Sequence, residues 1–150
     1  GQRFDDPAKP GAANLLARMM TRGTARRTPA ELENALKALG ASVNATATKE
    51  RILLTGSTLA RNYSATMALV REMLTEPRWD PAELALAKAA VTAQIADARA
   101  NPEALARRVT DAVSYGPDSV LARDLRGTPA SVAALTIDDL KAFHARNLSP

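Results

Sequence analysis

Along most of this chain, apolar residues recur with the 3.6-residue period of amphipathic helices. The period predicts helices over six stretches, which are residues 11–22, 29–39, 62–75, 80–99, 102–114 and 137–147. A capping residue followed by proline marks several helix starts, such as Thr28-Pro29, Asp80-Pro81, Asn101-Pro102 and Thr128-Pro129. Residues 117–127 follow no clear period and are predicted to be irregular or a short helix.

The period changes to two between the second and third predicted helices. Residues 41–48 alternate small apolar with polar side chains, Lys49-Glu50 predicts a turn, and residues 51–59 predict a second strand. Since a two-stranded hairpin is marginally stable alone, we expect it to belong to a larger sheet. The order αα-ββ-αααα predicts an α+β fold, with helices packed on one face of an antiparallel sheet of which this chain holds one hairpin.

The first predicted helix has two contrasting faces. Its apolar stripe consists of Ala12, Leu15, Leu16, Met19 and Met20. The opposite face carries Asn14, Arg18, Thr21 and Arg22. Asn14, Ala17 and Arg18 have the i, i+3, i+4 spacing that directs three side chains to one spot. None of the three is a metal ligand or a general base.

Two later helices have apolar stripes that we expect to face the core. On the helix at 62–75 the stripe is Tyr63, Met67, Val70 and Leu74. On the long helix at 80–99 it is Leu84, Ala87, Val91, Ile95 and Ala98.

The composition excludes several kinds of chemistry. The chain has no cysteine and a single histidine, His144, so it cannot by itself assemble an ordinary zinc site. We interpret His144 as a partly buried residue of the last helix rather than a catalytic base. No apolar run approaches the ~18 residues of a membrane span, and the sequence does not begin with a signal peptide.

The positive charge of the chain is small and dispersed. Its net charge is +4, from 20 Lys and Arg against 16 Asp and Glu, and aromatic residues make up only 3%. Few aromatic side chains are therefore present to stack on bases. This pattern favours an arginine-rich solvated surface over nucleic-acid binding.

Several short sequence motifs occur along the chain. They are Gly11-Ala12-Ala13, Met19-Met20, Gly23-Thr24, Leu39-Gly40-Ala41, Glu76-Pro77-Arg78-Trp79-Asp80-Pro81, Tyr115-Gly116, Gly127-Thr128 and Leu135-Thr136-Ile137-Asp138-Asp139-Leu140 with Phe143. No single one of these motifs is specific to a protein family. Their order and spacing over nearly the whole chain resemble the pitrilysin/insulinase and mitochondrial processing peptidase family.

In active members of that family, a His-x-x-Glu-His motif on the first helix holds zinc and activates water. A glutamate from the long helix completes the ligand set. Alignment through Gly11 and Gly23-Thr24 puts Asn14, Ala17 and Arg18 at the motif positions, and the third ligand at or beside Gln94. All four are substituted, and the fixed positive charge of an arginine repels zinc. The resemblance therefore implies a non-catalytic domain with no catalytic residue and no bound metal of its own.

The resemblance also implies a role beside a catalytic partner. Such domains form the wall of a peptide chamber, with the zinc in a homologous His-x-x-Glu-His domain or subunit, so the parent assembly is expected to be a zinc metalloendopeptidase. Asn14, Arg18 and Arg22 are then candidates for peptide contact, the alternative being an ordinary solvated helix face. Two other functions remain open: a structural or assembly subunit without a role in proteolysis and, as a weaker candidate, a basic module that binds nucleic acid.

The resemblance finally makes residues 1–150 a single segment, the middle of one inactive domain whose flanking strands lie outside it. Exposed strand edges recruit partners, so a homodimer of the chain is one way to cover them. We expect a periplasmic location, with the cytoplasm as the alternative.

Overall fold

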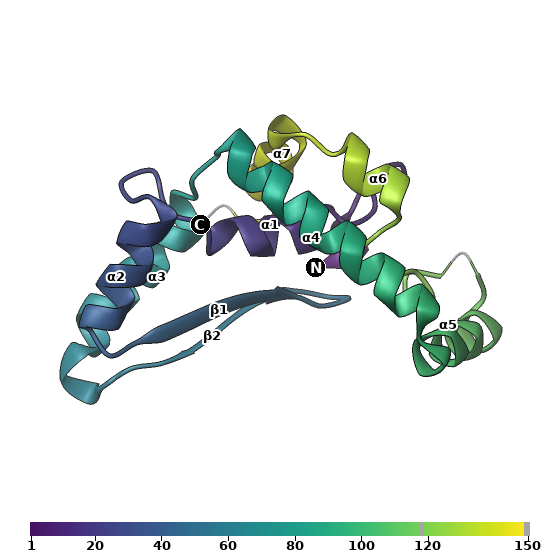
Figure 1. Cartoon of the computed structure of the whole chain (residues 1–150), viewed down its shortest axis with the longest axis horizontal. Coiled ribbons are helices and arrows are strands. Elements are labelled where there is room, and N and C mark those ends of the chain that lie inside the picture. The colour runs from purple at the N-terminus through teal and green to yellow at the C-terminus, as the bar shows by residue number, and fades with distance from the viewer. Residues whose placement is uncertain (118, 149–150) are drawn as a thin grey trace.

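Helices lie over one face of a two-stranded hairpin in the computed structural model, which describes residues 1–117 and 119–148 (Figure 1). The α-helices are α1 (Ala12–Met20), α2 (Pro29–Ala38), α3 (Tyr63–Thr75), α4 (Pro81–Ala100), α5 (Pro102–Tyr115), α6 (Pro129–Ala134) and α7 (Ile137–Asn147). The strands are β1 (Ser42–Ala47) and β2 (Ile52–Ser57), and the short 3-10 helices are η1 (Gln2–Phe4) and η2 (Ala60–Asn62). The predicted α+β class is confirmed.

All six predicted helices form, with ends that differ from the prediction by a few residues. The seventh helix, α6, was marked only by its start at Thr128-Pro129, because six residues are too few to display a period. Thr28, Thr128 and Thr136 each build a capping box with the residue three positions later. Position 118 of the irregular stretch lies outside the described residues. None of the described helices is long and apolar enough to cross a membrane.

The hairpin is antiparallel, and its register pairs Ser42 with Ser57 and Ala47 with Ile52. Because strand side chains alternate between faces, Ala45 and Ala47 share the face that looks toward α1, and both are buried. The strands of the described chain form a sheet of only these two. Strand β2 is therefore covered less well than β1.

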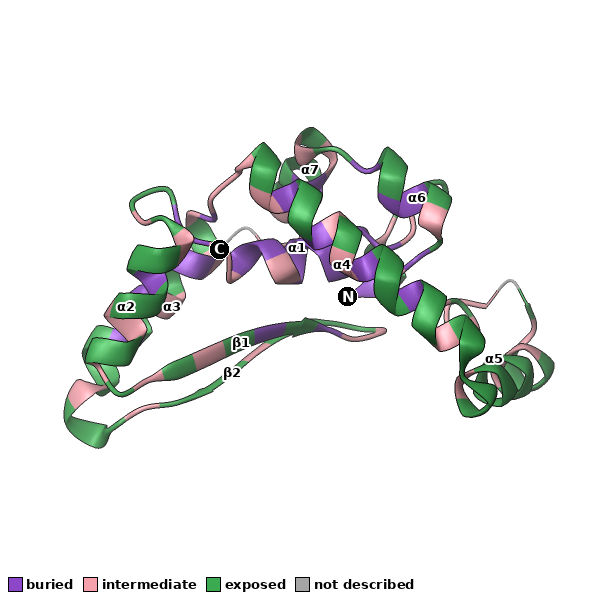
Figure 2. Ribbon diagram, in the orientation of Figure 1, coloured by how far each residue is buried: buried purple, intermediate pink, exposed green. Residues whose placement is uncertain are grey.

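Helix α1 is the centre of the fold. It packs against β1, α4 and α7, and eight of its nine residues are buried (Figure 2). Asp5 caps its start from outside the helix, since the carboxylate oxygens accept from the backbone N–H groups of Gly11 and Ala13 at 2.7 and 2.9 Å. Burial of Asp5 raises the pKa of its carboxyl group, although these hydrogen bonds oppose the rise.

Helix α3 packs in a different orientation from the one predicted. Its buried residues are Thr66, Leu69 and Met73, while Tyr63 and Met67 are 60% and 44% exposed. The helix carries two apolar stripes, and the buried one packs against α2 through Leu32, forming a small second core. Of the predicted stripe, Tyr63, Met67 and Val70 instead line a cavity of about 190 Å³ beside β2, whereas Leu74 is half-buried against the main core. The prediction was wrong for the first three residues because the period identifies apolar stripes without saying which neighbour each one meets.

The long helix α4 follows the prediction more closely. Leu84, Ala87, Val91 and Ile95 are buried in the main core, and Ala98 is half-buried. His144 on α7 is half-buried as well, and its Nε2 lies 2.6 Å from the carbonyl oxygen of Leu74. The ring of Trp79 meets His144 edge-on, with 5.7 Å between centroids. His144 therefore joins α7 to the end of α3.

Gly127 sits where the loop before α6 meets the start of α1. Its φ is +81°, and an added Cβ would lie 2.3 Å from the carbonyl oxygen of Pro10. Gly116 has a similar φ of +84°, but a Cβ there meets nothing within 4 Å. We expect Gly116→Ala to cost about 1–3 kcal/mol, because its φ of +84° with a ψ of 145° lies near a region that only glycine adopts readily. Gly127→Ala should cost about 2 kcal/mol more through the clash.

Urea unfolding of both variants measures the two costs, with Gly116→Ala as the matched control for φ alone. Equal losses of stability would show that Pro10 and the loop before α6 do not approach each other as closely as described.

Candidate functional site

The site assigned from the sequence lies where α1 meets α4. Arg18 on α1 and Gln94 on α4 are 76 residues apart, yet the Arg18 Nη2 donates to the Gln94 Oε1 at 2.5 Å. Gln94 is exposed and Arg18 is half-buried, so the bond lies at the rim of the interface between the helices. The fold thus brings together two of the four positions that the resemblance singled out.

The other two positions are enclosed. Ala17 is 1% exposed and Asn14 is 9% exposed, so the face that they share with Arg18 is not an ordinary solvated one. The Nδ2 of Asn14 and the Nε of Arg18 are both buried, and neither has a hydrogen-bond partner among the described residues. Buried donors without acceptors destabilise a fold, so this spot carries a cost that packing elsewhere must offset.

Positive charge gathers around Arg18. Burial lowers the pKa of its guanidinium, and the nearby Arg22 and Arg126 lower it further. Arg22, the third candidate for peptide contact, is half-buried and pairs with Glu83 of α4 at 3.3 Å. Arg126 donates through Nη1 to the backbone oxygen of Gln94 at 3.0 Å. Sequence reasoning did not single out Arg126, because nothing in its local pattern indicates contact with α4.

The residue types at this site do not suit a metal ion. Asn14, Ala17, Arg18 and Gln94 supply no carboxylate or imidazole, and Arg18 adds a fixed positive charge where a cation would sit. Across residues 1–117 and 119–148, no three His, Cys, Asp or Glu side chains are grouped so that they could hold a metal. Asn14 and Gln94 can donate and accept hydrogen bonds, Arg18 can only donate them, and none of the four side chains is a base or a nucleophile.

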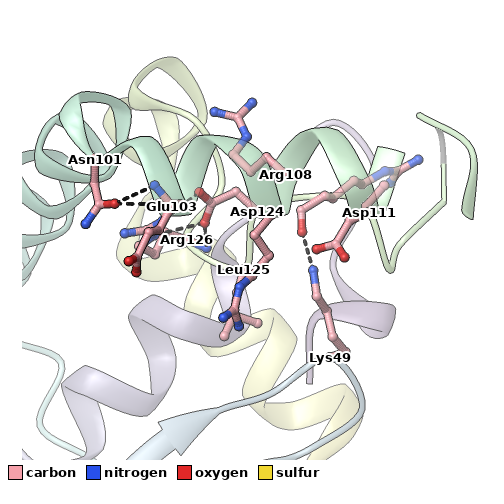
Figure 3. A pocket seen from close by; sticks show the side chains of 12 residues that line it. Lys49, Asn101, Glu103, Arg108, Asp111, Asp124, Leu125 and Arg126 are labelled. Carbon is pink, nitrogen blue, oxygen red and sulfur yellow. Dashed lines mark hydrogen bonds and ion pairs between the residues drawn. The ribbon is translucent and has the colours of Figure 1, made fainter. Parts of the chain in front are cut away.

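A larger cavity of about 340 Å³ opens between α5, the hairpin turn and the loop before α6 (Figure 3). Lys49 reaches from the turn to the loop before α6, where it donates to the backbone oxygens of Val120 and Arg123. In the same loop, Asp124 pairs with Arg126 at 2.9 Å. Arg126 therefore lies between this cavity and Gln94.

Comparison with known proteins relates the chain to one family of peptidases. The model of the family "Insulinase (Peptidase family M16)" matches residues 1–122. The chain is 26% identical to an uncharacterized zinc protease of Streptomyces coelicolor, over 100% of this chain and 32% of that protein. It is also 26% identical to the mitochondrial-processing peptidase subunit alpha of Solanum tuberosum, over 98% of this chain and 29% of that subunit. The chain thus spans about a third of the length of these curated relatives.

Solved structures show the same fold. A peptidase M16 inactive domain from Pseudomonas fluorescens superposes with a TM-score of 0.86 at 26% identity, covering 95% of this chain and 35% of that one. The periplasmic protease PqqL from Escherichia coli also gives a TM-score of 0.86, at 19% identity, covering 100% of this chain and 17% of that one. The second likeness concerns the fold alone.

Removing the unpartnered amide of Asn14 should stabilise the protein. In Asn14→Leu, a side chain of similar size replaces a buried donor that has no acceptor, so we expect a gain of about 1 kcal/mol. The matched control is Thr24→Val, since Thr24 is 0% exposed but its hydroxyl bonds both Glu72 and the N–H of Arg26. This control should lose about 1 kcal/mol.

Thermal and urea unfolding of the two variants and the wild type test the contrast. A loss of stability in Asn14→Leu comparable to that in Thr24→Val would mean that the Asn14 amide has an acceptor after all.

Proposed function

Since the chain belongs to the insulinase family (peptidase family M16), we propose that it is a non-catalytic domain of a zinc metallopeptidase. The observation that carries the proposal is the hydrogen bond between Arg18 and Gln94. It joins the two helices on which active members carry their zinc ligands. A neutral amide and a cation stand where ligands would be needed, so hydrolysis must occur on another domain or subunit.

In this proposal the domain forms part of the wall of a peptide chamber. The homologous partner carries His-x-x-Glu-His and the zinc ion, and the peptide passes Asn14, Arg18 and Arg22. The location of Asn14 and Arg18 on α1 supports the assignment, because α1 is the helix that bears the motif in active members, and Arg22 follows just after its end. A periplasmic location remains a prediction.

The open hairpin supports a further part of the proposal. The inward face of β2 includes Leu54 and Gly56, which line the cavity beside Tyr63 and Met67. Strand β2 also has an open outer edge, and a third strand paired with it would satisfy the free backbone groups there. We propose that residues 1–150 are the middle of one domain and that flanking strands, or a second copy of the chain, complete the sheet.

Assays of zinc content and casein cleavage test the proposed division of labour. The chain alone is expected to bind no stoichiometric zinc and to cleave no casein, because it supplies neither ligands nor a base. Mixed with its His-x-x-Glu-His partner, it should raise casein hydrolysis above that of the partner alone.

Stoichiometric zinc on the isolated chain, or casein cleavage by it, would contradict the inactive-domain assignment. An unchanged rate in the mixture, with complex formation verified by gel filtration, would instead favour a structural or assembly subunit.

Restoring ligands should restore metal binding if the aligned positions are right. The variant Asn14→His/Arg18→His/Gln94→Glu places two imidazoles at i and i+4 and a carboxylate on the facing helix, so it should hold about one zinc ion per chain. The control Asn14→His/Arg22→His/Gln94→Glu places its second histidine past the end of α1, eight residues from the first, and should hold none. Zinc is measured by mass spectrometry after dialysis, with circular dichroism to verify folding.

Equal zinc binding by the two triple variants, or none by the first in its folded form, would mean that the four positions are misaligned.

A further inference from the structure

Arg18 is a partly buried cation without a carboxylate partner. In the part of the chain that the structure describes, its only hydrogen-bond acceptor is the neutral Gln94 Oε1. The two arginines beside it are each neutralised, Arg22 by Glu83 at 3.3 Å and Arg126 by Asp124 at 2.9 Å. One uncompensated positive charge therefore remains at the rim between α1 and α4.

The geometry of Arg18 restricts how an acceptor can approach. Its Nε is buried and closed to any ligand, and Nη2 already donates one hydrogen to Gln94. The outer edge formed by the two terminal nitrogens keeps donors that face away from the core. A planar group with two oxygens can accept from both nitrogens end-on, which is the arrangement that a carboxylate makes with a guanidinium.

Asn14 adds to the donors that surround Arg18. It lies one turn before Arg18 on the same helix, is about nine-tenths buried and has an Nδ2 without an acceptor in the described structure. Because that nitrogen is enclosed, it does not contact a ligand at the rim, and the terminal nitrogens of Arg18 alone would receive one. Donors without acceptors suit an anionic oxygen nearby and do not suit a cation.

We propose that Arg18, flanked by Gln94, binds a carboxylate of the peptide, from an acidic side chain or the C-terminus. The inference rests on the proposed function, because the peptide must pass this helix. The site in which the family holds a cation is here an anion site, and it selects acidic peptides. A single uncompensated charge matches a carboxylate, whereas the neighbouring arginines that a phosphate would need are already paired.

Binding of fluorescent peptides to the wild-type chain, measured by anisotropy alone and with its catalytic partner, tests this selectivity. The probes are four decapeptides of one sequence, with Glu or Gln at the central positions and a free or amidated C-terminus. We expect at least one carboxylate-bearing probe to bind about tenfold tighter than the Gln, amidated one, since hydrogen bonds between charged groups contribute about 1.5–3 kcal/mol. The probe that gains identifies the source of the carboxylate.

Variants assign the selectivity to Arg18. Arg18→Gln should abolish the preference, so that all four probes bind this variant about equally. Arg18→Lys keeps the charge without the planar fork and should retain a smaller preference. The control is Arg71→Gln, an exposed arginine on α3 away from the site, which should behave like the wild type. Circular dichroism verifies that each variant is folded.

The outcomes separate the two proposals. Equal binding of all four probes by the wild type, or a preference that survives in Arg18→Gln, overturns the carboxylate site and leaves the proposed function intact. Failure of every probe to bind, alone and with the partner, contradicts the proposed function and the carboxylate site with it.

Discussion

Burial of α1 on nearly every side is the constraint on which the rest of the structure depends. The helix is short, yet β1, α4 and α7 all pack against it, and its Leu15, Leu16, Met19 and Met20 are fully buried. Small residues on its other sides, such as Ala13 and Ala17, leave room for the helices and the hairpin to approach. Because three neighbours share one central helix, a change in its position would move all of them together.

The burial of α1 also determines the properties of the site formed by Asn14, Ala17, Arg18 and Gln94. Substituting side chains on a helix whose position is already determined by packing can change the chemistry of a site without changing the fold. The Arg18–Gln94 hydrogen bond joins α1 to α4, and under the proposed alignment these are the two helices that a metal ion would join in active relatives. The unpartnered donors of Asn14 and Arg18 are a local cost that a purely structural helix would have no reason to retain.

Local chemistry made the helices and the hairpin predictable, whereas contacts between distant segments were not. A capping residue followed by proline, the 3.6-residue period of helices and the two-residue period of strands all depend on residues that are neighbours in the sequence. The sequence was therefore sufficient to predict α2, α4 and the hairpin. The orientation of α3 depends on whether α2 or β2 meets each of its stripes, and no local pattern contains that choice. Likewise, the period of α1 could not predict that Asn14 is buried, since its cover includes segments far along the chain. Gln94 was paired with Arg18 through the family resemblance alone, and Arg126 was missed.

The second, smaller core between α2 and α3 has a consequence for motion. Only Leu32, Leu69 and Met73 are buried there, and Val43 links this cluster to the hairpin. Local opening requires less free energy where fewer apolar contacts are lost. The α2–α3 pair should therefore exchange its amide hydrogens sooner than α1 or α4. That pair adjoins β2, so the end of the molecule where the sheet is incomplete is more deformable than the core around α1.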